Sequence, residues 1–66
     1  MIVYYSKHSR EQMISRGISE QEAREAIQSG AKHLQDDKIV AAYRYFAVVY
    51  KVVEKDCYFI ITIKPR

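Results

Sequence analysis

The 66-residue sequence has little of what small proteins use to stabilise a fold or to hold a cofactor. Its one cysteine, Cys57, cannot form an internal disulfide, and this favours a reducing, cytoplasmic location. The side chains of His8, His33, Asp36 and Cys57 lack the spacing of a metal site, and there is no glycine-rich phosphate loop. We therefore expect neither a metal ion nor another cofactor.

Long apolar runs are also absent, and so is the basic and apolar leader that marks a signal peptide. We expect a soluble protein that does not enter a membrane. A chain of this length is expected to form a single domain, residues 1–66, that buries roughly 60 % of the surface of its unfolded chain. Its stability alone should be marginal, so a partner chain would be a natural supplement.

Charge is present but unevenly distributed. The overall formal charge is +3; residues 1–37 have five cations and six acids, a net charge of −1, whereas residues 38–66 have six cations and two acids, a net charge of +4. The second half also contains four tyrosines between Tyr43 and Tyr58. Basic and aromatic side chains together suit a polyanion such as RNA. The same pattern fits a solvated basic face that only keeps the protein soluble.

Local patterns predict a first helix that begins after Ser6 and reaches about Arg16. The hydroxyl of Ser6 can cap the helix, and Gly17 can end it in the left-handed conformation. Met13 and Ile14 give this helix a narrow apolar stripe, which we expect to face the core.

A second helix follows directly. Ser19 and Glu22 form a capping box at its start, and Gly30 is expected to end it as a second glycine cap. Ile18 lies between the two helices, where it is expected to pack on Met13 of the first.

From residue 31 onward, the apolar residues follow the two-residue period of strands. The expected strands are residues 31–35, 39–45, 46–53 and 58–63, with a short β-prone stretch at residues 1–5. The order of elements predicts an α+β fold, with two N-terminal helices packed on a three- to four-stranded antiparallel sheet and a short N-terminal strand.

Alternation along the last strand divides its side chains between the two faces of the sheet. The set expected beneath the helices is Cys57, Phe59, Ile61 and Ile63. The opposite face would be polar, with Lys51, Thr62 and Lys64, together with Arg44 and one or two tyrosines. It is the best candidate for a site, although such residues are also ordinary on the solvated side of a sheet.

The run of His8, Met13 and Arg16-Gly17-Ile18-Ser19, with Thr62 and Ile63 near the end, resembles a small, mostly prokaryotic family of domains of unknown function. That family has the signature H-A-x-x-R-M-x-x-R-G-I-S, and the resemblance covers nearly the whole chain. The sequence departs from it at Ser9 and Gln12, where the family has alanine and a basic residue. The family is similar in turn to the RelE- and BrnT-type toxins of bacterial toxin–antitoxin pairs, which share a fold with barnase-like and colicin-like ribonucleases.

The resemblance implies a RelE-like fold, RNA as the substrate and an antitoxin protein as a partner. Metal-independent cleavage of RNA needs a base, an acid and cations that stabilise the phosphorane. His8 could be the base or the acid, because imidazole titrates near neutral pH, and Arg16 and Lys64 are candidate catalytic cations. The candidate RNA-binding residues are Arg10, Arg44, Lys51, Tyr50, Tyr58 and Thr62.

The residues leave a second function open, a non-catalytic protein-interaction module or homodimer on the same fold. Gln12 also fits a ribonuclease fold that has no activity. His8 could be an ordinary exposed residue of a first helical turn, and Arg16 a cation that balances the helix dipole. The decisive question is whether His8, Arg10 and Arg16 point toward the basic sheet or away from it.

Overall fold

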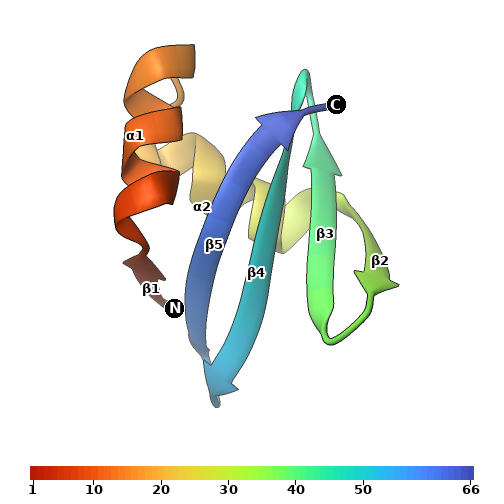
Figure 1. The fold of residues 1–66 in the computed structure, drawn as a ribbon. Helices are drawn as coiled ribbons and strands as arrows, with labels where there is room; N and C mark the ends of the chain where they lie inside the picture. The colour runs from red at the N-terminus through yellow and green to blue at the C-terminus, as the bar shows by residue number, and fades with distance from the viewer.

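The chain forms a short strand, two helices and then a four-stranded meander (Figure 1). The computed structural model describes every residue from 1 to 66. The bounds are β1 Ile2–Tyr5, α1 Lys7–Arg16, α2 Glu20–Ser29, β2 Ala31–Gln35, β3 Lys38–Tyr43, β4 Phe46–Glu54 and β5 Cys57–Pro65. The predicted α+β class is confirmed. Neither helix has the length and apolar character needed to span a membrane.

All five strands belong to one sheet, in the order β1-β5-β4-β3-β2. Strands β2 to β5 pair antiparallel, whereas β1 lies parallel to β5, from Ile2 opposite Cys57 to Tyr5 opposite Ile60. The four antiparallel strands and the short N-terminal strand are present as predicted, but the sheet is not wholly antiparallel, because the N-terminal strand joins it as a fifth, parallel strand. The N-terminal stretch satisfies its backbone groups on the outer edge of the last strand, a pairing that no local pattern encodes.

The ends of α1 are built as the sequence predicts. The Ser6 hydroxyl accepts a hydrogen bond from the Ser9 backbone N–H at 3.0 Å and donates one to the Ile61 carbonyl, which ties the helix start to β5. At the other end Gly17 has φ +68°, and the Ile18 N–H donates to the Met13 carbonyl at 2.9 Å. The Ser6 cap therefore fixes the start of α1 relative to β5, and the Gly17 cap ends the helix.

The two ends of α2 differ from each other. Ser19 and Glu22 form the predicted capping box, with bonds of 3.0 and 3.1 Å. Gly30, however, has φ −70° and ψ 161°, so the predicted glycine cap is not left-handed. The position requires glycine for another reason, because a Cβ there would lie 2.5 Å from the Ala26 carbonyl oxygen and 2.9 Å from that of Ala42. Gly30 therefore lets the end of α2 approach β3 closely.

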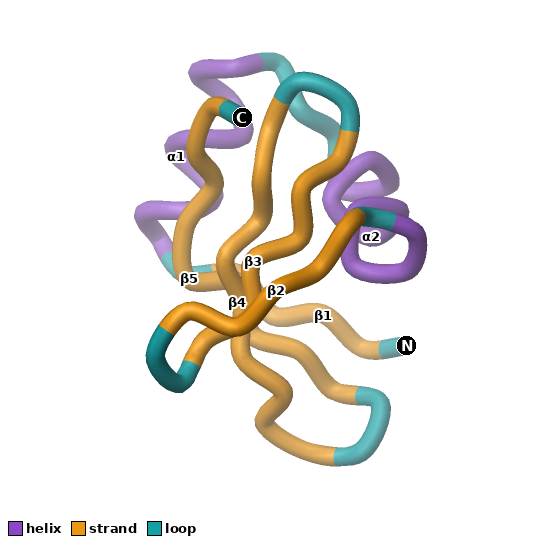
Figure 2. The backbone as a smooth tube through the Cα atoms, turned by 90° about the vertical axis from the view of Figure 1, so that its right-hand side faces the viewer, coloured by secondary structure: helices purple, strands orange, loops and turns teal.

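The helices cover one face of the sheet. Figures 1 and 2 show α2 lying across β3 and β4 on that face, while α1 runs beside β5. Met13 and Ile18 are buried in the core between helices and sheet, as predicted, but Ile14 is 83 % exposed. The predicted inward stripe is wrong at Ile14, because this side chain lies at the opening between α1 and α2 and not over the sheet. The largest fully buried apolar side chains are Phe46, Val48, Ile60 and Ile63.

A register shift between β4 and β5 changes which side chains of β5 face the helices. Val49 lies opposite Thr62, but the next residue, Tyr50, lies opposite Ile60, so Ile61 is an extra residue in β5. A bulge of this kind interrupts the alternation of side chains along a strand.

The predicted division of β5 is therefore wrong for half of its residues. Ile60, like Ile63, is a core residue. Cys57 and Phe59 come before the extra residue in the strand; they alternate with Ile60 and therefore face away from the helices. Thr62, beyond the extra residue, faces away as predicted. The sequence pattern alone could not locate the bulge, because Ile60 and Ile61 are equally apolar.

Candidate nucleic-acid interface

The sheet face without a helix is defined by side chains from the three central strands. Along β4, residues 47, 49 and 51 alternate with core residues 46, 48 and 50 and therefore point away from the helices. Their partners in the neighbouring strands extend this surface. We call it the helix-free face; its members on these strands are Lys38, Val40, Ala42, Ala47, Val49, Lys51, Phe59, Thr62 and Lys64, and His33 of β2 joins them opposite Val40.

The centre of the helix-free face is small and apolar. Val40, Ala47 and Val49 form a separate cluster in which each residue is at most 7 % exposed. No helix covers them, so the longer side chains that surround them on the same face shield them from water. The centre of the face is therefore almost inaccessible to water, and polar side chains form a rim around it.

The rim of this face is mainly cationic. The Lys51 Nζ lies 3.0 Å from one carboxylate oxygen of Asp37, and the Lys38 Nζ lies 3.6 Å from the other. The hydrogen bond from Lys51 is the main reason that the pKa of Asp37 is lowered. Lys64, opposite Ala47, forms no ion pair. Asp37 thus pairs with two of the three lysines, Lys64 has no acidic partner, and the rim keeps a net positive charge.

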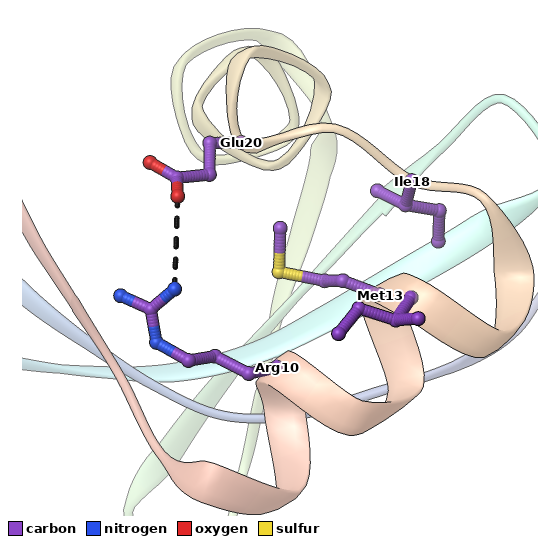
Figure 3. Close-up of a pocket in the computed structure, with 5 residues that line it drawn as sticks. Arg10, Met13, Ile18 and Glu20 are labelled. Atoms are coloured by element: carbon purple, nitrogen blue, oxygen red, sulfur yellow. Dashed lines mark ion pairs between the residues drawn. The ribbon is translucent and has the colours of Figure 1, made fainter.

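Arg10 points away from this face, toward α2. Its guanidinium lies over the Tyr5 ring, 4.8 Å from the centroid, and 3.7 Å from the Glu20 carboxylate. Figure 3 shows this ion pair at the mouth of a pocket of about 240 Å³ between the two helices, with Met13 and Ile18 at its base. Arg10 therefore belongs to the helix pair and not to the helix-free face.

The opposite flank of α1 holds the other two residues in question. Because successive residues are turned by about 100°, His8, Gln12 and Arg16 lie on the side of the helix away from Arg10. The Arg16 Nε donates to the Gln12 amide oxygen at 3.1 Å, and His8 is exposed. Ser6 anchors the start of α1 to β5, and the helix packs on that strand. His8 and Arg16 thus lie on the side of α1 away from Arg10, and neither forms a hydrogen bond or an ion pair with a residue of the sheet.

Arg44 lies at the turn between β3 and β4 and reaches back over the helix-covered side. Its guanidinium is 3.3 Å from the Glu22 carboxylate and 3.9 Å from that of Glu25, and it stacks on the Tyr43 ring at 5.3 Å. The pKa of Glu22 is lowered, chiefly by the hydrogen bond from the Ser19 backbone and to a lesser degree by Arg44. Arg44 therefore ties the hairpin to α2.

Tyr50 and Tyr58 also lie on the helix-covered side. Tyr50 is 2 % exposed, and its ring meets that of Tyr58 edge to face at 5.8 Å. Burial, with a smaller effect of Tyr58, raises the pKa of Tyr50. Neither ring is therefore on the surface where Lys51 and Lys64 lie.

The structure thus divides the candidate residues into two groups. Lys51, Thr62 and Lys64 share the helix-free face, whereas His8 and Arg16 lie on α1, on its side away from Arg10. Arg10, Arg44, Tyr50 and Tyr58 lie elsewhere. Sequence reasoning missed Lys38 and His33, which the two-residue turn at Asp36 and Asp37 places on this face by register. That turn was predicted, so pairing the two strands across it could have found them.

Comparison with known proteins supports the fold and the family. Residues 5–64 match the family described as "Domain of unknown function (DUF4258)". No curated protein matches the sequence. The fold is similar to a chain in the crystal structure of the toxin–antitoxin complex RelBE2 from Mycobacterium tuberculosis, with a TM-score of 0.68 and 13 % sequence identity. The similarity covers 98 % of this chain and 96 % of that one.

Proposed function

The chain belongs to the DUF4258 family, and from that premise we propose that it is a toxin-like protein that binds RNA on its helix-free face. The observation that carries the proposal is the rim of three lysines around a buried apolar centre, on the one sheet face that no helix covers. Cations at such a rim suit the phosphates of a nucleic acid. The similarity in fold to RelBE2 supports a toxin–antitoxin role.

We further propose that bound RNA is cleaved without a metal ion. The 2′-oxygen of a ribose attacks the adjacent phosphorus, the bond from phosphorus to the 5′-oxygen breaks, and a 2′,3′-cyclic phosphate forms. His8 takes the proton of the 2′-hydroxyl, Lys64 gives a proton to the leaving 5′-oxygen, and Arg16 stabilises the charge of the phosphorane. The support for these roles is that α1, which carries His8 and Arg16, packs on β5, which carries Lys64.

Such a toxin would be held by an antitoxin protein in the cytoplasm, where Cys57 stays reduced. A protein partner would also add to the stability of this small domain, because anything that binds only the folded state stabilises it.

Incubation of the purified protein with single-stranded and structured RNA in EDTA tests the activity. We expect cleavage to a cyclic phosphate, and we expect His8→Ala and Lys64→Ala to abolish it. Lys55→Ala, an exposed lysine in the turn between β4 and β5, is the matched control and should keep full activity. RNA that stays intact at high protein concentration would overturn the catalytic step, and loss of activity in the control would overturn the assigned roles.

One observation favours a second function, a homodimer without catalysis. Strand β2 is an edge of the sheet, all five of its residues are exposed, and Leu34 is 76 % exposed. Free edges of this kind can pair with a second strand. Sedimentation of the wild type and Leu34→Lys tests it: a dimer that the substitution splits supports this function, and a monomer at all concentrations excludes it.

A further inference from the structure

The tip of the hairpin between β3 and β4 presents an exposed aromatic ring that packs on the core along one edge. Tyr45 is 56 % exposed, and its ring meets Phe46 edge to face at 5.4 Å and 74°. Phe46 is fully buried in the core, so the contact restrains the tyrosine from beneath. An exposed ring that is already ordered loses little conformational freedom when a ligand covers it.

The neighbouring residue in the turn, Arg44, directs its side chain toward α2. Arg44 has φ +53°, a left-handed conformation that is uncommon for a residue other than glycine, and its side chain reaches Glu22 and Glu25 on α2. Backbone strain of this type persists only where surrounding contacts hold it. The two ion pairs supply such contacts, and Tyr45 is left without an acidic neighbour in the turn.

A second cation is held at the same turn by backbone hydrogen bonds. The Arg66 backbone N–H donates to the Tyr45 carbonyl at 3.2 Å, and one nitrogen of its guanidinium donates to the Arg44 carbonyl at 3.1 Å. A guanidinium has five N–H donors, so most remain free for an anion. Lys64, two residues earlier in β5, is exposed on the helix-free face.

We propose that Tyr45 is a stacking platform for one base of single-stranded RNA, with Arg66 and Lys64 contacting the flanking phosphates. This inference rests on the proposed RNA-binding function and extends its surface from the helix-free face to the hairpin tip. Strand β4 leads from Tyr45 to Ala47 on that face, so one RNA strand can contact both.

The chemistry favours a single strand over a duplex. A base inside a duplex is stacked on both sides, whereas an unpaired base has a free face that an aromatic ring can cover. Stacking is tolerant of sequence, because every base has such a face. The ring of Tyr45 therefore adds affinity for unpaired RNA without selecting one base.

Binding of two fluorescent probes tests this. One is a short oligoadenylate, and the other is a ribose-phosphate strand of the same length without bases. We expect the wild type to bind the oligoadenylate about 10-fold more tightly than the abasic strand, and Tyr45→Ala to remove that difference. Tyr45→Phe keeps the ring and should keep the difference. Lys64→Ala should weaken the binding of both probes alike.

Ile14→Ala is the control, because Ile14 is also exposed, at 83 %, but lies at the opening between α1 and α2 and away from the helix-free face. Its removal should leave the difference between the probes unchanged. If Tyr45→Ala binds both probes as the wild type does, the stacking role of Tyr45 is wrong, but the RNA-binding function is not contradicted. If the wild type binds neither probe, both are wrong. If Ile14→Ala has the same effect as Tyr45→Ala, the hairpin tip has no special role.

Discussion

The two faces of the sheet differ in how they exclude water. On the helix-covered face, Phe46 and Ile60 are wholly buried beneath α1 and α2. On the helix-free face only three small residues, Val40, Ala47 and Val49, are buried, and lysines surround them. Burial of large apolar side chains is the main source of folding stability. The comparison indicates that the first face stabilises the domain and that the second is free to bind an anion.

The largest effect should come from truncating a side chain on the helix-covered face. We expect Phe46→Ala to lower the free energy of unfolding by about 3–5 kcal/mol, because it leaves a large cavity in the core. Val49→Ala, on the helix-free face, removes two methyl groups and should cost about 1.5 kcal/mol. Urea unfolding followed by circular dichroism measures both. Equal losses would contradict the difference between the two faces.

The next effect concerns the point where α2 comes closest to the covered face. Gly30→Ala should destabilise the domain by about 2–3 kcal/mol, because its Cβ would collide with the carbonyl oxygens of Ala26 and Ala42. Gly17→Ala meets open space but has φ +68°, and should cost about 1 kcal/mol. Thermal unfolding of both variants gives the order; a milder effect at Gly30 would mean that α2 does not pack so closely on β3.

These two glycines also show what the sequence can predict. The caps at Ser6, Gly17 and Ser19 depend on residues within one helical turn, and all three were predicted correctly. The role of Gly30 depends on Ala42 of β3, and the parallel pairing of β1 joins the two ends of the chain. Such contacts between distant segments leave no periodic pattern in the sequence.

The candidate site divides in the same way. Lys51, Thr62 and Lys64 could be placed together from the alternation of side chains between the two faces. This alternation holds along β4 as far as Lys51, and in β5 for the residues after the bulge. Tyr50 lies on the other face, and the sequence could not assign its side because both faces of β4 contain valines. The position of His8 depends on how α1 docks on β5, which the Ser6 bond to Ile61 decides.

A third prediction separates binding from stability. Lys64→Ala should change the free energy of unfolding by less than about 0.5 kcal/mol, because this exposed lysine has no ion pair. It should reduce the slope of log affinity for single-stranded RNA against log salt by about 0.7, the value for one lost phosphate contact. Fluorescence anisotropy at several salt concentrations measures the slope.

Two further variants test whether RNA binding is confined to the helix-free face. Asp37→Asn should strengthen RNA binding, because it removes the acid that faces Lys51 and Lys38. Arg24→Ala removes an exposed cation on α2, on the other side of the sheet, and should leave the slope unchanged. A slope that falls equally in Arg24→Ala would show that RNA binding is not confined to the helix-free face.

The smallest effect is a pH dependence on the helix-covered side. The pKa of Glu22 is lowered from its ordinary value of 4.5, so its charged form stabilises the folded state. This contribution is present above the ordinary pKa and is lost as the pH falls through the lower pKa of the folded state. The Tm of the wild type should therefore fall more between neutral pH and pH values below 4.5 than that of Glu22→Gln. Identical pH profiles would contradict the role of Glu22.

Mapping the contact surface directly tests whether RNA binds the helix-free face. We would titrate the uniformly ¹⁵N-labelled protein with short single-stranded RNA and follow the backbone amides by NMR. The account predicts that the amides of Ala47, Val49, Lys51, Thr62 and Lys64 shift and that those on the outer side of α2 do not. Shifts confined to α2, or no shifts at RNA concentrations that saturate binding, would contradict it.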